Sequence, residues 1–218
     1  MKNQDIGEAL VSTGWAVLTS HDVTLDELQD RVYSIALELG PIRASRKRRG
    51  LVDHLRPTNT WAANPRSLSA VYGTGEFPWH TDGAHWPVPP RYLVIACAQA
   101  SPAAATTFVW DARQCESINS AIASRAVFRI SNGARSFYST ATSSLRPYYR
   151  YDPGCMSPMD SAAKVLQEAI EQEGASVTSQ ITWKPGLIAI IDNWRCLHRR
   201  ANAGQDSTRY LLRSTVMG

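Results

Sequence analysis

The fold is decided by the stretch Lys184-Pro-Gly-Leu-Ile-Ala-Ile-Ile-Asp-Asn-Trp-Arg-Cys-Leu-His198, which joins a short apolar run to a turn and a histidine. The run Leu187–Asp192 predicts a strand, because it is β-prone and lies between residues typical of turns. Other short runs rich in β-branched or aromatic residues predict further strands at 67–72, 91–98, 106–110, 126–130, 177–183 and 208–216. Many short strands favour a sandwich or barrel over an alternating βαβ sheet.

Helices are predicted at two places outside these strands. A β-prone segment over 14–19 precedes Thr24 and Glu27, whose spacing is that of a capping box at a helix start. Apolar residues then recur at helical spacing until Gly40 ends the helix. A second helix is predicted over 160–173, where the apolar residues share one face. The sequence therefore predicts a mainly β core with a few peripheral helices.

Composition predicts an ordered, globular chain. Of its 218 residues, 44% are hydrophobic and 19% are charged, which is enough apolar material for a core and excludes wholesale disorder. No repeat or linker divides the sequence, so a single domain over residues 1–218 is expected. No apolar run approaches the length of about 18 residues that a membrane span needs. The 4 cysteines form no CxxC pair, and the first residues do not read as a secretory signal, so a reducing cytoplasm is expected.

A candidate metal-binding set combines two histidines and one acidic residue. His80 and Asp82 lie at alternate positions, so on a strand both side chains point to the same face. His198 follows the apolar run Leu187–Asp192 and supplies a second imidazole. Two imidazoles and one carboxylate leave the other positions of an octahedral ion open, which suits a non-haem Fe(II) that activates oxygen. A zinc-type hydrolase uses the same ligand types, so that function stays as an alternative.

An arginine in the terminal β-prone segment distinguishes these two alternatives. A cosubstrate that chelates iron through a 2-oxo acid and ends in a second carboxylate needs a fixed guanidinium, since arginine offers carboxylates a bidentate fork. Arg209 fits that need, and Thr107 is a candidate second donor to the same carboxylate. The arginine therefore favours an oxygenase over a hydrolase.

The chain resembles the Fe(II)/2-oxoglutarate-dependent dioxygenases of the taurine dioxygenase (TauD/TfdA)-like family over most of residues 60–218. The resemblance lies in the stretches FPWHTDGAHWPVPPRYL, TTFVWDA and KPGLIAIIDNWRCLHRRANAGQDSTRYLLRS. It implies a double-stranded β-helix, or jelly roll, in which His80, Asp82 and His198 are the iron ligands. It also implies that the enzyme consumes O2 and 2-oxoglutarate and hydroxylates a small molecule, or oxidises a C–H bond in a related way.

The same resemblance implies how the cosubstrate is bound. Thr107 and Arg209 would hold 2-oxoglutarate, and Arg213 would reach an acidic group of the cosubstrate or the substrate. The family's Gly-Gly before the threonine reads Ala-Ala-Ala at 103–105, so Thr106 competes with Thr107. The position of Arg213 suggests an anionic substrate, such as an amino acid or a natural-product intermediate. Asp82 fills the carboxylate position, so halogenation is not expected.

Aromatic and histidine residues beside the metal motif are candidate substrate contacts, and for each of them packing is the alternative. They are Tyr72, Trp79, His85 and Trp86. The chain is short for the family, so a reduced substrate lid, or one supplied by a second copy in a homo-oligomer, is expected.

A basic run lies at 43–49 and consists of Arg43, Arg46, Lys47, Arg48 and Arg49. It is interpreted either as a solvated loop or as a surface that attracts an anionic substrate or a carrier protein. A non-catalytic jelly-roll module that binds an anionic partner through this run is a second alternative function. Nucleic acid is not an expected partner, because the run lacks interleaved aromatics for base stacking.

Overall fold

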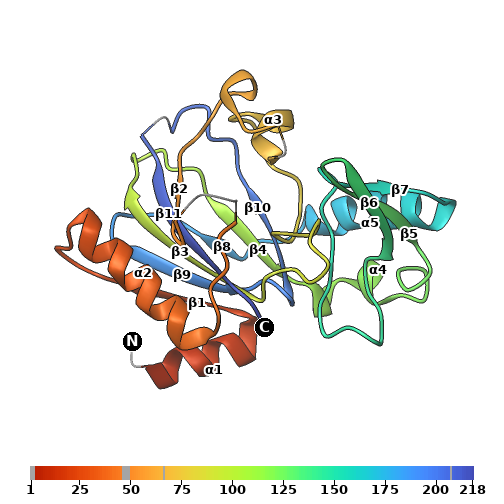
Figure 1. The fold of residues 1–218 in the computed structure, drawn as a ribbon, viewed down its shortest axis with the longest axis horizontal. Helices are drawn as coiled ribbons and strands as arrows, with labels where there is room; N and C mark the ends of the chain where they lie inside the picture. Colours follow the sequence, from red (N-terminus) through yellow and green to blue (C-terminus); the bar gives the residue numbers. More distant parts are fainter. Residues whose placement is uncertain (1–2, 46–49, 66, 207) are drawn as a thin grey trace.

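Two facing β-sheets form the body of the molecule (Figure 1). The structure is a computed structural model that describes residues 3–45, 50–65, 67–206 and 208–218. The larger sheet is antiparallel. Its strand order is β1 (Trp15–Thr19), β9 (Leu187–Asp192), β3 (Tyr92–Gln99), β11 (Tyr210–Val216) and β2 (Asp53–Leu55).

The smaller sheet contains His198, which lies on its strand β10. Its strand order is β10 (Cys196–Arg200), β4 (Thr107–Asp111) and β8 (Gln180–Ile181). The segment 77–80 continues this sheet on the free side of β10. Phe77 N donates to Arg200 O at 2.9 Å, and His80 and His198 exchange backbone hydrogen bonds of 3.0 and 2.9 Å. The sheet therefore extends across the metal motif.

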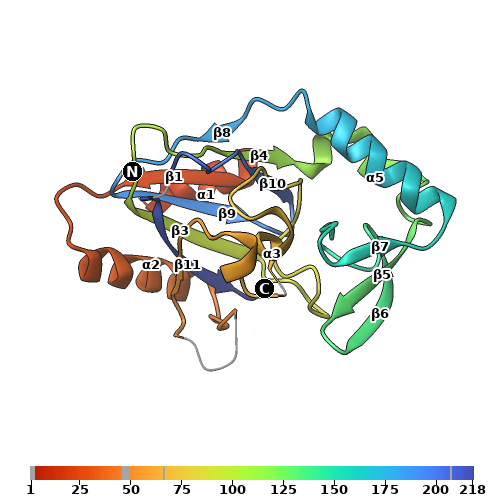
Figure 2. The same cartoon turned by 90° about the horizontal axis from the view of Figure 1, so that it is seen from above.

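Apolar residues of alternating strand positions fill the space between the two sheets. This inner core includes Leu93, Ile95, Val109, Ile181, Trp183, Ala189, Ile191 and Leu211. The outer face of the larger sheet packs against α2 (Leu25–Leu39) through Leu28, Val32 and Ala36. Figure 2 shows α2 on one side of β3 and β11 and the smaller sheet on the other side. The layers thus leave the inner face of β11 turned toward β10.

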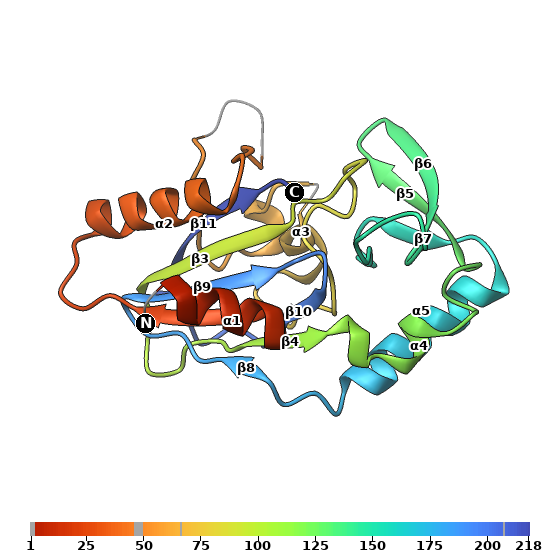
Figure 3. The same cartoon turned by 90° about the horizontal axis from the view of Figure 1, so that it is seen from below.

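A second lobe packs beside the sandwich (Figure 3). It holds a sheet of β6 (Arg135–Thr140), β5 (Val127–Asn132) and β7 (Met156–Pro158), with the helices α4 (Glu116–Asn119) and α5 (Ser161–Gly174). Its core includes Phe128, Ile130, Leu166 and Ile170, and it reaches Trp79 and Trp110 of the smaller sheet. Trp79 is fully buried there. One continuous apolar cluster therefore ties the lobe to the metal motif.

The predicted helices are confirmed. Thr24 caps α2, and Thr24 and Glu27 form the complete capping box. Asp160 caps α5, its side chain accepting from Ala163 N at 2.7 Å. The structure adds α1 (Asn3–Thr13) and two 3-10 helices, Thr60–Ala62 and Ala112–Gln114. Within the part of the chain that is described, no helix combines the length and apolarity needed to cross a bilayer.

Two predicted strands are wrong in whole or in part. The segment predicted at 67–72 forms the helix α3 (Leu68–Tyr72), which ends at Gly73 with a φ of 53°. A short apolar run does not separate helix from strand by pattern alone, and here no neighbouring strand supplies hydrogen-bond partners along the described part of the chain. The strand predicted at 177–183 is reduced to β8, which pairs only with Thr107 and Phe108.

A glycine on α5 tests the contact between the lobe and the smaller sheet. A Cβ on Gly174 would overlap the indole ring of Trp79. We expect Gly174→Ala to lower the free energy of unfolding by about 1–3 kcal/mol, because overpacking a closed core is costly. Gly7→Ala is the matched control, since nothing lies within 4 Å of a Cβ on this α1 residue. Chemical denaturation measures both, and equal stability of the two variants would contradict the packing.

Candidate metal centre

The two histidines of the metal motif are direct neighbours across two backbone segments. His80 lies at the end of the 77–80 segment and pairs with His198 on β10 through the exchanged backbone hydrogen bonds. Residues paired in this way point their side chains to the same face of the sheet. The centroids of the two imidazole rings are accordingly 4.3 Å apart. The sheet itself brings the two predicted ligands together.

Asp82 is placed by a turn that a buried asparagine holds. Its backbone N–H donates to Asn193 Oδ1 at 2.7 Å, and Asn193 Nδ2 donates to the carbonyl oxygens of Asp82 at 3.0 Å and Pro90 at 2.8 Å. Asn193 lies in the turn between β9 and β10 and is fully buried. No role is predicted for Asn193 from the sequence. Its position in the turn between the apolar strand β9 and the strand that carries His198 could have indicated one.

The donor atoms of the three predicted ligands converge. Asp82 Oδ1 lies 3.6 Å from His80 Nε2 and 3.7 Å from His198 Nε2. One ligand atom from each residue lies within 4.8 Å of the others. The two histidine side chains are 7% and 8% exposed, and the Asp82 side chain is 18% exposed. The three donor atoms are therefore close together, and Asp82 is the most exposed of the three side chains.

Hydrogen bonding prepares the imidazoles for a cation. His80 Nδ1 lies 2.9 Å from Pro78 O, so it carries the proton and leaves the Nε2 lone pair facing Asp82. Burial and the neighbouring His80 lower the pKa of His198, which favours the neutral ligand form. Burial alone would raise the pKa of Asp82, but Arg213 and the two imidazoles hold it well below its ordinary value. Two imidazole nitrogens and one carboxylate oxygen match the donor set preferred by Fe(II).

Arg213 contacts the carboxylate of the metal motif directly. Its Nη1 donates to Asp82 Oδ2 at 2.6 Å, and its Nη2 donates to Asp53 Oδ2 at 3.0 Å. From the sequence, Arg213 is expected to contact an acidic group of a small molecule. In the structure it pairs with two carboxylates of the protein, one of them on β2, which is far away in sequence but is the neighbouring strand.

Arg209 is buried at the other end of the terminal strand. It is 7% exposed, its Nη1 donates to Ala105 O at 3.0 Å, and its Nε lies 4.0 Å from Asp206 Oδ2. Asp206 is itself occupied, because it accepts hydrogen bonds of 2.9 Å from Ala105 N and from Ser101 Oγ. Burial lowers the pKa of Arg209 despite this carboxylate. A buried cation with a loosely placed partner can accept a further anion.

The strand alternation of β4 separates the two candidate threonines. Thr107 lies on the same face as Val109, which packs between the sheets, whereas Thr106 precedes the strand and points the other way. Thr107 is buried, and its Oγ1 accepts from Trp183 Nε1 at 2.9 Å. It also lies opposite Arg200, a buried arginine whose pKa is lowered to about 10 by burial and by Arg209. Thr107 is therefore the better placed of the two.

The candidate substrate contacts divide into two groups. Tyr72 meets Phe77 at a ring distance of 6.2 Å, and Phe77 meets His80 edge-on at 6.2 Å, so this aromatic row leads to the metal motif. His85 stands edge-on to Trp86 at 5.9 Å. Trp86 is covered in turn by the guanidinium of Arg43 at 4.2 Å.

Trp79 belongs to neither group. It points into the core of the second lobe, where it is fully buried against Trp110. The expectation that it contacts substrate is therefore wrong. The reason is strand alternation, which sends neighbouring side chains to opposite faces, so the position next to His80 faces away from the metal motif.

A second carboxylate near the metal motif was not predicted as a site residue. Asp152 accepts hydrogen bonds from Gly154 N at 2.8 Å and from Cys155 Sγ at 3.4 Å. Burial raises its pKa. Its charge acts on His80 and His85, and after burial it is the main cause of the raised pKa of Tyr72. Asp152 is placed close to the metal motif by its neighbour Tyr151, whose backbone is hydrogen-bonded to Thr81.

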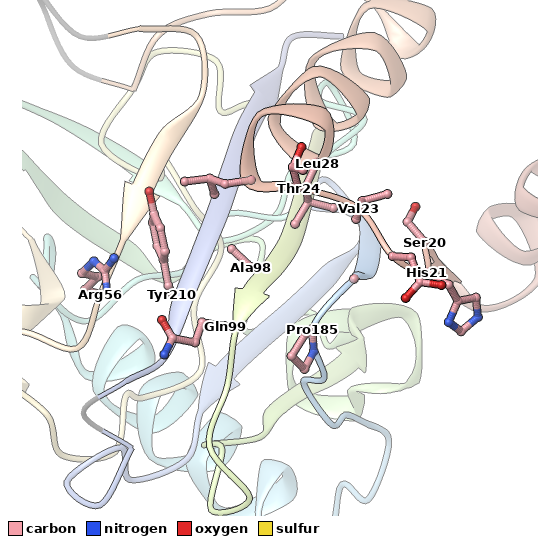
Figure 4. A pocket seen from close by; sticks show the side chains of 13 residues that line it. Ser20, His21, Val23, Thr24, Leu28, Arg56, Ala98, Gln99, Pro185 and Tyr210 are labelled. Atoms are coloured by element: carbon pink, nitrogen blue, oxygen red, sulfur yellow. The ribbon is translucent and has the colours of Figure 1, made fainter.

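The basic run is described only at Arg43, because Arg46, Lys47, Arg48 and Arg49 lie outside the described residues. A separate hollow of about 590 Å³ lies where the N-terminal end of α2 meets β3 and β11 (Figure 4). Its lining includes Thr24, Arg56, Gln99 and Tyr210, and among the described residues it contains none of the predicted site residues. It is therefore distinct from the metal motif.

Comparisons with known proteins find solved structures with a similar fold. The structure of an asparagine oxygenase in complex with Fe(II), 2S,3S-3-hydroxyasparagine and succinate matches with a TM-score of 0.76 at 17% identity, covering 98% of this chain and 78% of that one. The non-heme iron oxygenase OrfP in complex with Fe and alpha-ketoglutaric acid matches with a TM-score of 0.72 at 21% identity, covering 98% and 78%. A comparison with curated proteins gives no match.

The solved structures confirm the predicted mainly β jelly-roll fold. A family model, taurine catabolism dioxygenase TauD, TfdA family, matches residues 2–115 and 122–215. This match covers most of the chain and confirms the resemblance that the sequence motifs indicate. The chain therefore belongs to the taurine catabolism dioxygenase TauD, TfdA family.

Proposed function

We propose that this dioxygenase couples the oxidative decarboxylation of 2-oxoglutarate by O2 to the hydroxylation of a free amino acid or a closely related small molecule. The observation that carries the proposal is the convergence of His80 Nε2, His198 Nε2 and Asp82 Oδ1 on one point. In the overall balance, one oxygen atom enters succinate and the other enters the substrate C–H bond. Carbon dioxide leaves, and 2-oxoglutarate and the substrate C–H bond each supply two of the four electrons that reduce O2.

Three side chains would hold Fe(II) in this proposal. His80 and His198 would bind it through Nε2, and Asp82 would bind it through Oδ1. When bound, the iron supplies the redox chemistry that activates O2. The protein orients the imidazoles for a cation, because His80 Nδ1 donates to Pro78 O and leaves Nε2 facing Asp82. Burial lowers the pKa of His198, whereas the contact with Asp82 raises the pKa of His80 against the effect of burial. The surrounding residues also exclude water, since both histidines are almost fully buried.

Arg209 and Thr107 would bind the distal carboxylate of 2-oxoglutarate. Arg209 is buried, and Asp206 stands 4.0 Å from its Nε, so the guanidinium keeps donors for a further anion. Thr107 Oγ1 accepts from Trp183, and its hydroxyl proton is therefore free to be donated. This arrangement favours an oxygenase over a zinc-type hydrolase, which needs no carboxylate-ended cosubstrate.

The substrate class follows from a carboxylate beside the metal motif. Asp152 follows Tyr151, whose backbone is hydrogen-bonded to Thr81 of the metal motif, and its charge acts on His80 and His85. A half-buried carboxylate is stabilised by a cationic partner. An ammonium group of an amino acid supplies such a partner. Tyr72, His85 and Trp86 would line the remaining wall. The similar structures named above were obtained with an amino-acid product or a 2-oxo acid, which supports a small-molecule substrate. A cytoplasmic location and a carrier-protein or homo-oligomeric partner stay predictions.

The ligand set is tested by removing its carboxylate. We expect Asp82→Ala to lose the visible absorption that Fe(II) and 2-oxoglutarate produce together under anaerobic conditions, and to lose succinate formation in air. The control is Asp30→Ala, on the exposed side of α2, which should keep both. Wild-type turnover by Asp82→Ala would remove Asp82 from the ligand set. Activity of the native chain without O2 and 2-oxoglutarate would favour the zinc-type hydrolase.

The cosubstrate site is tested at Arg209. Arg209→Gln removes a charged hydrogen-bond donor, so we expect the KM for 2-oxoglutarate to rise by about 10- to 100-fold, the equivalent of about 1.5–3 kcal/mol. Arg113→Gln is the control, because Arg113 is 53% exposed and pairs with Asp111 at the surface. Steady-state succinate formation measures both variants. An unchanged KM in Arg209→Gln would place the cosubstrate elsewhere.

The substrate proposal is tested at Asp152. We expect Asp152→Asn to keep 2-oxoglutarate binding and to lose most of the stimulation of succinate release by amino acids, because the ammonium group loses its partner. Glu168→Gln, on the exposed side of α5, is the control. A screen of free amino acids supplies the stimulating compound. Equal stimulation of Asp152→Asn and the native chain would rule out this contact.

A further inference from the structure

A chain of polar contacts runs from the edge strand β2 to the metal motif. Ser45 Oγ donates to Asp53 Oδ1 at 2.8 Å. The other oxygen of Asp53 accepts from Arg213 Nη2 at 3.0 Å, and Arg213 Nη1 donates to Asp82 Oδ2 at 2.6 Å. The chain therefore connects a loop, two strands and a predicted iron ligand through side chains alone.

The last contact of this chain divides the two oxygens of Asp82. Oδ2 is occupied by Arg213, whereas Oδ1 faces His80 Nε2 and His198 Nε2 at 3.6 and 3.7 Å. A charge-assisted hydrogen bond to one oxygen fixes the rotation of the carboxylate. Asp82 thus presents a single oxygen to the point on which the imidazoles converge.

The register of the larger sheet places Asp53 beside Arg213. The two residues are direct partners in the antiparallel pairing of β2 with β11. Direct partners have their side chains on the same face, so the strand pairing itself brings Asp53 to the guanidinium of Arg213. Asp53 is 7% exposed, and a carboxylate so deeply buried needs a cationic partner. The short strand β2 therefore brings one buried charge to the inner face of the sheet.

Asp53 also supplies a second carboxylate to Arg213. The guanidinium is enclosed by two carboxylates, because Nη1 contacts Asp82 at 2.6 Å and Nη2 contacts Asp53 at 3.0 Å. Its Nε is buried and has no hydrogen-bond partner among the residues that are described. Arg209 differs, because its carboxylate neighbour stands 4.0 Å away and is bonded to other groups. Of the two arginines on this segment, Arg209 is the less closely paired and keeps donors for an anion.

We propose that Asp53 is a positioning residue that holds Arg213 against Asp82, presets one Asp82 oxygen for the metal and withdraws Arg213 from anion binding. This inference rests on the proposed function, since it assumes that Asp82 is a metal ligand. It replaces the expectation that Arg213 meets an acidic group of the cosubstrate or the substrate. Of Arg209 and Arg213, Arg209 then remains available to an anion.

The test uses the apo-protein and Co(II), a divalent ion that needs no anaerobic handling. We expect Asp53→Asn to weaken Co(II) binding by about 10- to 100-fold in isothermal titration, because second-layer partners of metal ligands have effects of this size. Asp30→Asn is the matched control: Asp30 lines the same surface hollow as Asp53 but is exposed on α2. It should bind Co(II) as the native chain does.

A second measurement, inhibition by sulfate, tests whether Arg213 becomes able to bind an anion. In Asp53→Asn, Arg213 loses a carboxylate, so added sulfate should inhibit succinate formation at lower concentration than in the native chain. Ser45→Ala keeps the Asp53 charge and removes only one donor, so it should shift Co(II) binding in the same direction by a smaller factor. This variant also keeps the test valid if circular dichroism shows that Asp53→Asn is unfolded.

The outcomes distinguish a failure of the positioning role of Asp53 from a failure of the proposed metal centre. If the native chain binds Co(II) and the folded Asp53→Asn variant binds it equally well, with unchanged sulfate inhibition, Asp53 has no positioning role while the proposed function stands. If Asp53→Asn is unfolded, native-like Co(II) binding by Ser45→Ala overturns the inference. If the native chain binds no Co(II), the metal centre fails and the inference fails with it.

Discussion

The pair of backbone hydrogen bonds between His80 and His198 is the contact on which the site depends. It extends the smaller sheet by the segment 77–80 and makes two residues that are distant in sequence direct cross-strand neighbours. Side-chain direction then follows from the strand geometry, which turns both imidazoles inward. The turn beyond this pair is held by Asn193, which bonds both the N–H and the carbonyl of Asp82. A metal centre built on paired backbone is rigid, because moving either ligand breaks main-chain hydrogen bonds.

Two arginines at β11 differ in how their charges are compensated. Arg213 lies on the strand, and Arg209 directly precedes it. Arg213 is enclosed by Asp82 and Asp53, whereas Arg209 keeps donors beyond its contact with Ala105. Both guanidiniums lie in the layer between the sheets, where an uncompensated charge is costly. The fold compensates one with protein carboxylates, and the proposed function compensates the other with the cosubstrate. The same chemistry applies to Asp152, a half-buried carboxylate, for which the substrate is the proposed counter-charge.

Much of the fold and the ligand set could be predicted from local sequence. The capping box at Thr24 and the apolar strand at Leu187–Asp192 act over a few residues, so pattern and propensity suffice for them. The segment at 67–72 shows the limit, because an apolar run of five or six residues fits a helix as well as a strand. Trp79 shows another limit: its neighbour His80 is in the site, but alternation places Trp79 in the lobe core. Which face is the inner one depends on the sheets that meet there.

The residue types of the site and their order along the chain can be predicted from the sequence, because metal ligands and a carboxylate-binding arginine need specific chemistry. The mainly β character can be predicted too, since strand propensity and turn residues act locally. Which charges compensate each other depends on how the strands pair in the folded chain. Asp53 meets Arg213 because β2 pairs with β11 in one register, and Asn193 meets Asp82 because two turns close on each other. Such contacts join residues far apart in sequence, and no local pattern encodes their register.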